Sequence, residues 1–247
     1  LRKAIAKRHH KLTGQQVSIE NICIFSGAQN ALFSVCLCLL EFGDEVIVPE
    51  LFYATYPATV TAGGATFIPI PTNAEMGFQP DPKSISNAIT PKTRAVLLNS
   101  PNNPTGAVYS PRTLKTILEL CRKHKIWVIS DEVYSEIATE GFTPIASLPG
   151  NHEQTVTISS LSKSHRMTGW RCGWMIGNEK LTRHLTNLNL CMNYGLPAFI
   201  QDASFKALEK YQITAKKVKK RLDSNRKILR HELKYMQRTK LFAEGGG

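Results

Sequence analysis

The sequence has 247 residues, of which 42% are apolar, and it carries a formal net charge of +12. This apolar share is ordinary for a globular protein. No run of about 18 apolar residues marks a membrane span. Residues 1–14 lack the apolar core of a secretory signal, so we expect a cytoplasmic protein with no membrane partner.

Apolar runs that suit strands alternate along the chain with runs that suit helices. Residues 1–14 have the pattern of a helix. The expected strands lie at residues 22–27, 45–50, 65–70, 94–100, 127–134, 155–162 and 172–178. The expected helices between them lie at residues 28–42, around 53–62, at 81–89 and at 110–124. This alternation predicts an α/β fold, a three-layer sandwich with a mostly parallel sheet.

Four of the expected strands run into polar segments of unusual composition. These segments are FSGAQN, LLNSPNNPTG, VISDEVY and SSLSK. In parallel α/β sheets, ligands collect beyond the carboxyl ends of the strands. The sequence therefore predicts that the four segments line one crevice.

Lys163 differs from a typical surface lysine. It stands between Ser162 and Ser164, at the end of an expected core strand, and no acidic residue lies within nine positions on either side. Surface lysines usually lie among other charged residues. We therefore interpret Lys163 as an amine held at the mouth of the strand for chemistry.

Three motifs carry a family resemblance. NSPNNPTG (99–106), SDEVY (130–134) and SLSKSHRMTGWRCGW (160–174), in this order and spacing, resemble the class I/II pyridoxal-phosphate-dependent aminotransferases, the fold-type I family of aspartate aminotransferase. The set of three is highly specific, and the resemblance covers nearly the whole chain. It implies a large domain at residues 1–205 that binds pyridoxal 5'-phosphate, incomplete at its beginning. At residues 206–247 it implies a connecting helix and the start of a small domain.

The resemblance assigns roles to side chains around the reactive half of the cofactor. Lys163 would form the aldimine and move a proton at the substrate's α-carbon. Asp131 would hold the protonated ring nitrogen, whereas Glu132 would point to the other side of the strand. Tyr134 and Asn103 would contact the phenolic oxygen, although Asn103 also suits an ordinary turn. The expected catalytic residues are Lys163, Asp131 and Tyr134.

A phosphate site is expected where the first strand meets the next helix. Gly27 lets the backbone approach closely, and the amides of Ala28 and Gln29 would open the helix, where anions bind. The resemblance adds a bidentate cation and two hydroxyl donors. The expected phosphate contacts are Gly27, Ala28, Gln29, Ser160, Ser162 and Arg171.

An aromatic residue is expected to stack on the cofactor ring. Within PELFYATYP (49–57), the resemblance places this residue at Tyr53, and we expect Phe52 and Tyr56 to be packing residues. Arg166 matches no required position and is expected to be structural or solvent-facing.

The resemblance also implies a homodimer, because the active site of the family is shared between subunits. NYGLPA (193–198) resembles a loop that reaches the neighbouring site. The family's carboxylate-binding arginine is expected beyond residues 241–247, which resemble the start of a strand, and a partner tyrosine is expected before residue 1. The small-molecule partners are therefore expected to be an amino acid and a 2-oxo acid whose identities stay open.

The leading interpretation is an aminotransferase with a ping-pong mechanism. One alternative is a carbon–sulfur β-lyase, but such relatives carry NPVG or NPIG where this chain has NPTG (103–106). Another is a non-catalytic sensor domain of a regulator, which the basic helix expected at residues 216–238 would suit. No DNA-binding motif is visible, so we expect no nucleic-acid partner.

The chain has six cysteines, none of them in a CxxC pair or at metal-ligand spacing with histidine. Most lie in apolar segments, as buried thiols do. We therefore expect no metal site and reduced structural cysteines.

Overall fold

The computed structural model describes residues 1–138, 141–149, 153–236, 238–239 and 242. Within this part of the chain, seven strands form one sheet in the order β1-β7-β6-β5-β4-β2-β3. The strands are β1 (Ile22–Phe25), β2 (Glu45–Pro49), β3 (Thr66–Ile70), β4 (Thr93–Asn99), β5 (Trp127–Asp131), β6 (Thr155–Ser160) and β7 (Gly173–Ile176). Strand β7 is antiparallel to both of its neighbours, and the other pairs are parallel. The predicted α/β fold with a mostly parallel sheet is confirmed.

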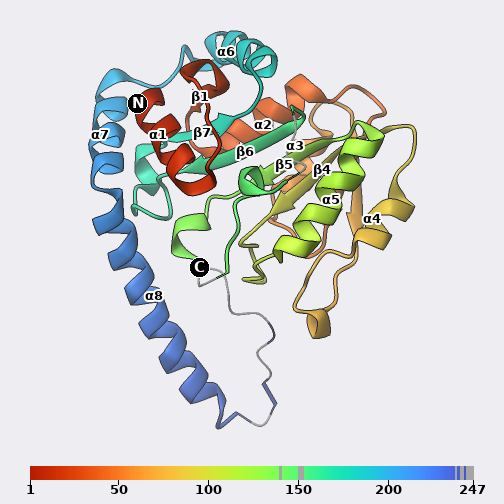
Figure 1. Ribbon diagram of the computed structural model, residues 1–247, viewed down its shortest axis with the longest axis vertical. Coiled ribbons are helices and arrows are strands. Elements are labelled where there is room, and N and C mark those ends of the chain that lie inside the picture. Colours follow the sequence, from red (N-terminus) through yellow and green to blue (C-terminus); the bar gives the residue numbers. More distant parts are fainter. Residues whose placement is uncertain (139–140, 150–152, 237, 240–241, 243–247) are drawn as a thin grey trace.

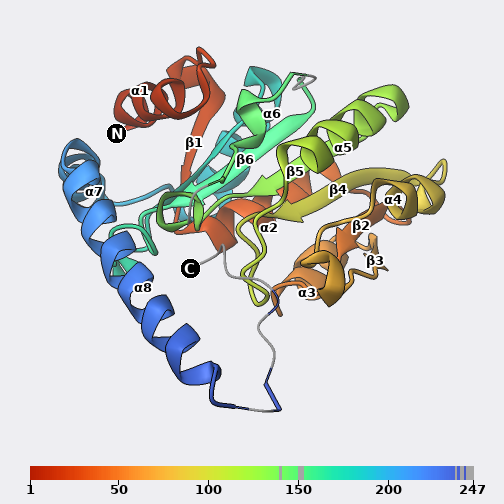
Figure 2. The ribbon, with the colours of Figure 1, turned by 60° about the horizontal axis from the view of Figure 1, so that its bottom comes forward.

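Helices cover both faces of the sheet and complete three layers (Figure 1 and Figure 2). The helices are α1 (Arg2–Thr13), α2 (Ala28–Leu39), α3 (Tyr56–Thr61), α4 (Pro82–Ala88), α5 (Pro111–His124), α6 (Glu179–Asn193), α7 (Ala198–Glu209) and α8 (Tyr211–Leu233). Short 3-10 helices are η1 (Ile19–Asn21), η2 (Ala74–Met76), η3 (Ser135–Ile137), η4 (Ile145–Ser147) and η5 (Thr168–Trp170). Helices α2, α3 and α6 pack on one face. The other face is covered by α4 and α5 over one half and by α1 and α7 over the other.

The central strands are buried on both faces, which explains why they form continuous apolar runs in the sequence. In β4, Leu97 packs into the core on the α2 side and Leu98 into the core on the α5 side. In β2, Val46 and Ile47 divide in the same way. Each such side chain contributes roughly 1.5–3 kcal/mol by leaving water, so the sheet forms a stiff platform for the groups at its edge.

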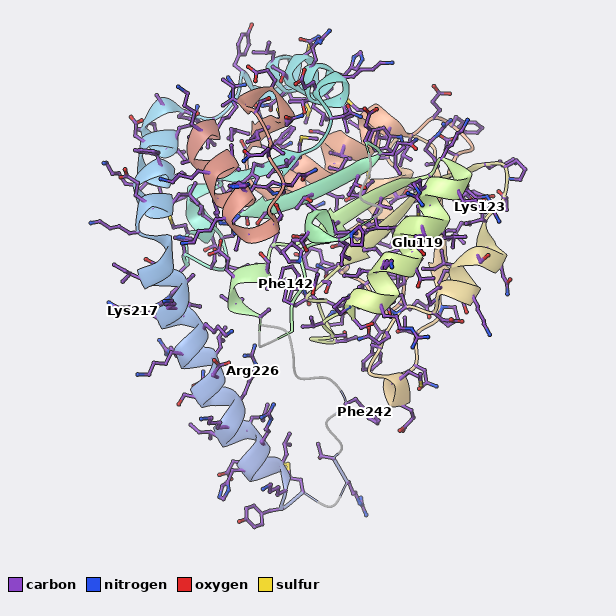
Figure 3. The ribbon with its side chains drawn as sticks, in the orientation of Figure 1. Glu119, Lys123, Phe142, Lys217, Arg226 and Phe242 are labelled. Carbon is purple, nitrogen blue, oxygen red and sulfur yellow. The ribbon has the colours of Figure 1, made fainter. Side chains whose placement is uncertain are left out.

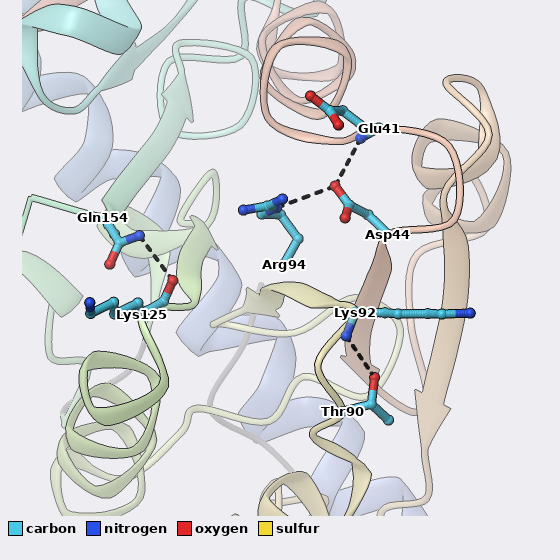
Figure 4. A network of polar contacts seen from close by, with 7 residues as sticks. All are labelled: Glu41, Asp44, Thr90, Lys92, Arg94, Lys125 and Gln154. Carbon is cyan, nitrogen blue, oxygen red and sulfur yellow. Dashed lines mark hydrogen bonds and ion pairs between the residues drawn. The ribbon is translucent and has the colours of Figure 1, made fainter.

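The amino-end edge of the parallel strands is closed by polar contacts (Figure 4). The Asp44 carboxylate accepts hydrogen bonds from the Glu41 backbone N–H at 2.9 Å and from Arg94 Nε at 3.3 Å. The carbonyl of Lys125 accepts from Gln154 Nε2 at 3.0 Å. These contacts hold the segments that lead into β2, β5 and β6, and the candidate functional side chains lie at the opposite edge.

The predicted helix boundaries agree with the observed ones in some cases and differ in others. The expected Asp-Pro start is confirmed, because the Asp81 side chain accepts from Lys83 N and Ser84 N at the head of α4. The helix expected around 53–62 is shorter than predicted: α3 begins at Tyr56, with Pro57 in its first turn. Helices α6 and α7 were not predicted, since polar residues such as Asn189 occupy buried positions and weaken the apolar period.

Helix α8 leaves the sandwich and carries the basic segment outward, with Lys217 and Arg226 along it (Figure 3). The helix expected at 216–238 thus ends at Leu233 and begins at Tyr211. Its apolar side chains are covered only near its start, because Ala215 is 5% exposed whereas Ile228 and Leu229 are 59% and 51% exposed. Helix α8 is therefore a basic helix whose surface is largely in contact with solvent.

The predicted division of the chain lies near this helix. The boundary between residues 205 and 206 falls within α7, and the division into two domains stays a prediction. The strand start expected at residues 241–247 lies outside the described residues, apart from Phe242.

Candidate active site

A cavity of about 340 Å³ opens at the carboxyl ends of β4, β5 and β6. The predicted cofactor residues share this cavity, although they come from five separate segments. Those that line it are Ala28, Gln29, Tyr53, Asn103, Asp131, Tyr134, Ser160, Ser162, Lys163 and Arg171. Gly27 stands beside it as the N-cap of α2. The expected single crevice is therefore present.

One end of the cavity is positive. Gly27 has a φ of 94°, and a Cβ at this position would lie 2.5 Å from Arg171 Nη2. Arg171 donates from Nη1 to the Thr168 carbonyl at 2.9 Å and from Nη2 to the Ser26 carbonyl at 3.4 Å. The guanidinium thus lies over the start of α2, where Ala28 opens the helix without a side-chain cap. Helix dipole and guanidinium together suit a phosphate.

Gly173 is a functional position that the sequence did not reveal. A Cβ there would lie 2.5 Å from both Ala28 N and Gly27 C. Only glycine lets β7 approach the start of α2 this closely. This approach also places Arg171, two residues earlier, over the helix terminus. In the sequence, the glycine between Trp170 and Trp174 was the only sign that the backbone passes close to another segment here.

The same cavity also contains an acidic group, the carboxyl of Asp131, at the end of β5. Asp131 is 8% exposed. Its Oδ2 accepts from Tyr56 Oη at 2.7 Å, and its Oδ1 accepts from Val133 N at 3.2 Å. Burial raises the pKa of Asp131, and the hydrogen bond from Tyr56 acts against that shift. The cavity therefore has a buried carboxyl group held by two donors.

Glu132 points to the other side of the sheet, as expected from alternation along the strand. Its Oε1 accepts from Ser130 Oγ at 3.1 Å and from Ile145 N at 2.9 Å. Burial raises the pKa of Glu132 to about 7. This carboxyl group therefore does not belong to the cavity, but it titrates near neutrality.

Replacing Glu132 with glutamine flattens the dependence of stability on pH. The folded state keeps the proton up to about pH 7, whereas the unfolded state loses it near pH 4.5, the ordinary pKa of a glutamate side chain. Wild-type stability therefore falls as pH rises through this window, and the E132Q variant lacks this loss. We expect the variant to gain about 3 kcal/mol relative to wild type between pH 4.5 and 7, measured by urea unfolding.

The surface variant Glu119→Gln, on α5, is the matched control (Figure 3). It removes a carboxylate of the same type from a half-exposed ion pair with Lys115. Parallel stability curves for wild type and E132Q would contradict the assignment.

Lys163 lies at the mouth of the cavity, just beyond β6. Its Nζ is 5.6 Å from the ring centroid of Tyr134. Asn103 Nδ2 donates to Tyr134 Oη at 3.1 Å, and Asn103 N donates to Asn99 Oδ1 at 2.8 Å. The two side chains expected at a phenolic oxygen thus already contact each other. Asn103 does more than form a turn, and Asn99, absent from the predicted set, orients it.

Helix α3 is clamped to α2 by side-chain hydrogen bonds. Thr55 Oγ1 donates to Gln29 Oε1, and Gln29 Nε2 donates to Thr59 Oγ1, both at 2.8 Å. Gln29 was predicted only for its amide. The threonines, four residues apart and so on one helix face, were the signal that sequence reasoning missed.

The aromatic residues before and within α3 have different environments. Tyr53 is 41% exposed on the cavity wall, and its ring lies 5.9 Å from that of Tyr56 at 74°. Phe52 packs against Phe67 as expected. The expectation for Tyr56 needs correction: its ring packs in the core, but its hydroxyl also binds Asp131. Arg166 is exposed, as expected.

The residues fit pyridoxal phosphate. Gly27 and Arg171 form a tight cradle for a phosphate at one end. A buried carboxyl group, Asp131, suits a ring nitrogen. The hydrogen-bonded pair of Tyr134 and Asn103 suits a phenolic oxygen, and an amine stands nearby to receive an aldehyde.

All six cysteines lie among the described residues and are free thiols. In that part of the chain, the structure has no helix both long enough and apolar enough to cross a membrane. The same residues form no group of three or more His, Cys, Asp or Glu side chains that could hold a metal ion.

Comparison with known proteins gives concordant matches. The family model for aminotransferase class I and II matches residues 1–244. Arginine–pyruvate transaminase AruH of Pseudomonas aeruginosa is 51% identical over 210 residues, which are 85% of this chain and 53% of that protein. Aspartate aminotransferase of Thermotoga maritima is 36% identical over 210 residues, 85% of this chain and 56% of that protein. A solved Thermus thermophilus aspartate aminotransferase, a tetra mutant, has a TM-score of 0.95 at 29% identity, covering 100% of this chain and 68% of that one.

The chain spans about half the length of the curated relatives it matches. Members of the matching family use pyridoxal phosphate, the cofactor that the cavity fits. The matches favour neither the β-lyase nor the sensor alternative. The chain belongs to the class I and II aminotransferases, the family of aspartate aminotransferase.

Proposed function

We propose that the protein is a pyridoxal-phosphate-dependent aminotransferase that moves an amino group from an L-amino acid to a 2-oxo acid by a ping-pong mechanism. The observation that carries the proposal is the convergence of Lys163, Asp131 and Arg171 on one cavity. The relatives named as transaminases support it.

Each residue of the cavity has a separate task. Pyridoxal phosphate, when bound, supplies an aldehyde that accepts amino groups and a ring that withdraws electrons. Arg171 and the first amides of α2 would bind the phosphate, and the carboxylate of Asp131 would hold the ring nitrogen. Tyr134, with Asn103 beside it, orients the phenolic oxygen. The amine of Lys163 removes and returns a proton at the substrate's α-carbon.

Arginine and pyruvate are the first substrates to test. The support is the 51% identity to arginine–pyruvate transaminase, against 36% to an aspartate aminotransferase. The experiment supplies pyridoxal phosphate and arginine, then measures alanine formed from pyruvate, with aspartate and 2-oxoglutarate as the comparison pair. Alanine formation only when both substrates are present supports the proposal. Pyruvate released from cystathionine without an acceptor would instead identify a β-lyase.

A homodimer is proposed on an exposed apolar surface of α6 and α7. Four side chains there are 42% to 90% exposed: Leu190, Met192, Tyr194 and Phe199. Such patches on soluble proteins mark contact sites. We expect sedimentation to give twice the chain mass of 27.5 kDa.

The variant Phe199→Asp is expected to shift this equilibrium toward the monomer, because a carboxylate replaces a large apolar contact. Phe42→Asp is the control, since Phe42 is 92% exposed in the segment between α2 and β2. A monomeric wild-type protein would contradict the dimer.

Two coarser features complete the proposal. Residues 1–205 form the large domain and residues 206–247 lead into a second one, which the departure of α8 from the sandwich supports (Figure 2). A cytoplasmic location is supported by the six free thiols. Limited proteolysis near α8 and cell fractionation test these two statements.

A further inference from the structure

We propose that Tyr56 is a positioning residue for Asp131: its hydroxyl orients the Asp131 carboxylate toward the cofactor's ring nitrogen. The inference rests on the proposed function, because the orientation matters only when pyridoxal phosphate is bound. It assigns to Tyr56 a role beyond packing.

The Tyr56 hydroxyl has little freedom. Tyr56 is 1% exposed, and its ring belongs to the core cluster between α2 and the sheet. The hydroxyl donates to Asp131 Oδ2 at 2.7 Å, a distance typical of a strong bond to a carboxylate. At the N-terminus of α3, the bonds that link Thr55 and Thr59 to Gln29 fix the helix. The donor is therefore held in place by both packing and hydrogen bonds.

The Asp131 carboxylate can accept at least one further hydrogen bond. A carboxylate has about four acceptor sites. The described protein donors are one for each oxygen, Tyr56 for Oδ2 and Val133 N for Oδ1. The carboxyl group also lines the cavity. The carboxylate is thus held by two protein donors, and its remaining acceptor positions are available to a group in the cavity that it lines.

The charge of Asp131 depends on such donors. Burial favours the neutral acid, and the bond from Tyr56 is the largest of the effects that oppose it, ahead of Val133 N and the charge of Lys163. A neutral acid would leave the ring nitrogen without a charged partner. The hydroxyl therefore supports the electron-withdrawing state of the ring as well as the orientation of its partner.

The variant Tyr56→Phe separates positioning from packing, because it keeps the buried ring and removes only the hydroxyl. Tyr109→Phe is the matched control. Tyr109 is 2% exposed, but it packs in the cluster on the α5 side of the sheet and is not among the residues that line the cavity. Both variants lose one buried hydroxyl, and only one of them loses a donor to Asp131.

The test uses pyridoxal phosphate labelled with ¹⁵N in the ring. Nuclear magnetic resonance of the bound cofactor reports whether the ring nitrogen is protonated, and titration of the visible band gives the dissociation constant. In Tyr56→Phe we expect the ¹⁵N resonance to move toward its unprotonated position and the dissociation constant to rise roughly tenfold. In Tyr109→Phe we expect both to stay at the wild-type values.

Each other outcome has a defined meaning. If Tyr56→Phe keeps the wild-type resonance and affinity, Tyr56 only packs and the inference is overturned. Equal changes in both variants also overturn it, because the effect would then belong to any buried hydroxyl. If wild-type protein gives no visible band with pyridoxal phosphate, the proposed function itself fails, and this result is distinct from the other two.

Discussion

Replacing Lys163 with alanine lowers the rate of amino transfer on the order of 10⁴-fold. The variant loses the amine that moves the proton at the α-carbon, while Arg171, the start of α2 and Asp131 still hold the cofactor. Affinity for pyridoxal phosphate should therefore fall far less than the rate. Amino transfer is measured with the best substrate pair, and borohydride reduction followed by peptide mapping locates the covalently held cofactor.

The control for this variant is Arg166→Ala, three residues further on. Arg166 is exposed and carries a positive charge, but it does not line the cavity. We expect wild-type turnover and a pyridoxyl label on Lys163 in the control. A label on a different lysine in wild-type protein would refute the assignment of Lys163.

Replacing Gly27 with alanine lowers the affinity for pyridoxal phosphate by roughly 10²-fold. The new methyl group would lie 2.5 Å from Arg171 Nη2, so the guanidinium must leave its place over the start of α2. The backbone of Gly27, with φ 94° and ψ 165°, adds strain of about 1–3 kcal/mol for any L side chain. The measurement compares pyridoxal phosphate with pyridoxal, which lacks the phosphate. We expect a large loss for the first and a small loss for the second.

Gly43→Ala separates strain from contact. Gly43 also has a positive φ, 86°, but a Cβ there meets nothing within 4 Å. Both variants should lose similar stability in thermal unfolding, and only Gly27→Ala should lose phosphate affinity. An equal loss of affinity for pyridoxal and its phosphate would show that Arg171 does not bind the phosphate.

The polar residues at the ends of the strands could be predicted to lie together, because parallel α/β sheets bind ligands at one edge. Buried parallel strands appear as apolar runs, and their carboxyl ends share one edge. The positions of Asn103, Asp131 and Lys163 at that edge follow from the sequence pattern alone. The resemblance then identified the ligand that such residues suit.

Contacts between distant segments were not predictable. The partner of the Tyr56 hydroxyl lies 75 residues away, and a tyrosine in an apolar segment gives no sign of whether its hydroxyl has a function. The need for glycine at position 173 depends on the backbone of Gly27 and Ala28, which only the folded sheet brings near. The antiparallel direction of β7 likewise depends on pairing and not on the composition of the strand.

Pairing of β1 with β7 has a consequence for the order of events during synthesis. The phosphate cradle joins Ser26 to Arg171 across 145 residues. At translation rates of 5–20 residues per second, the second half of the cradle leaves the ribosome on the order of ten seconds after the first. Until then the growing chain has no place to hold the phosphate. Binding of the phosphate therefore has to follow assembly of the whole sheet, including the pairing of its first strand with its last.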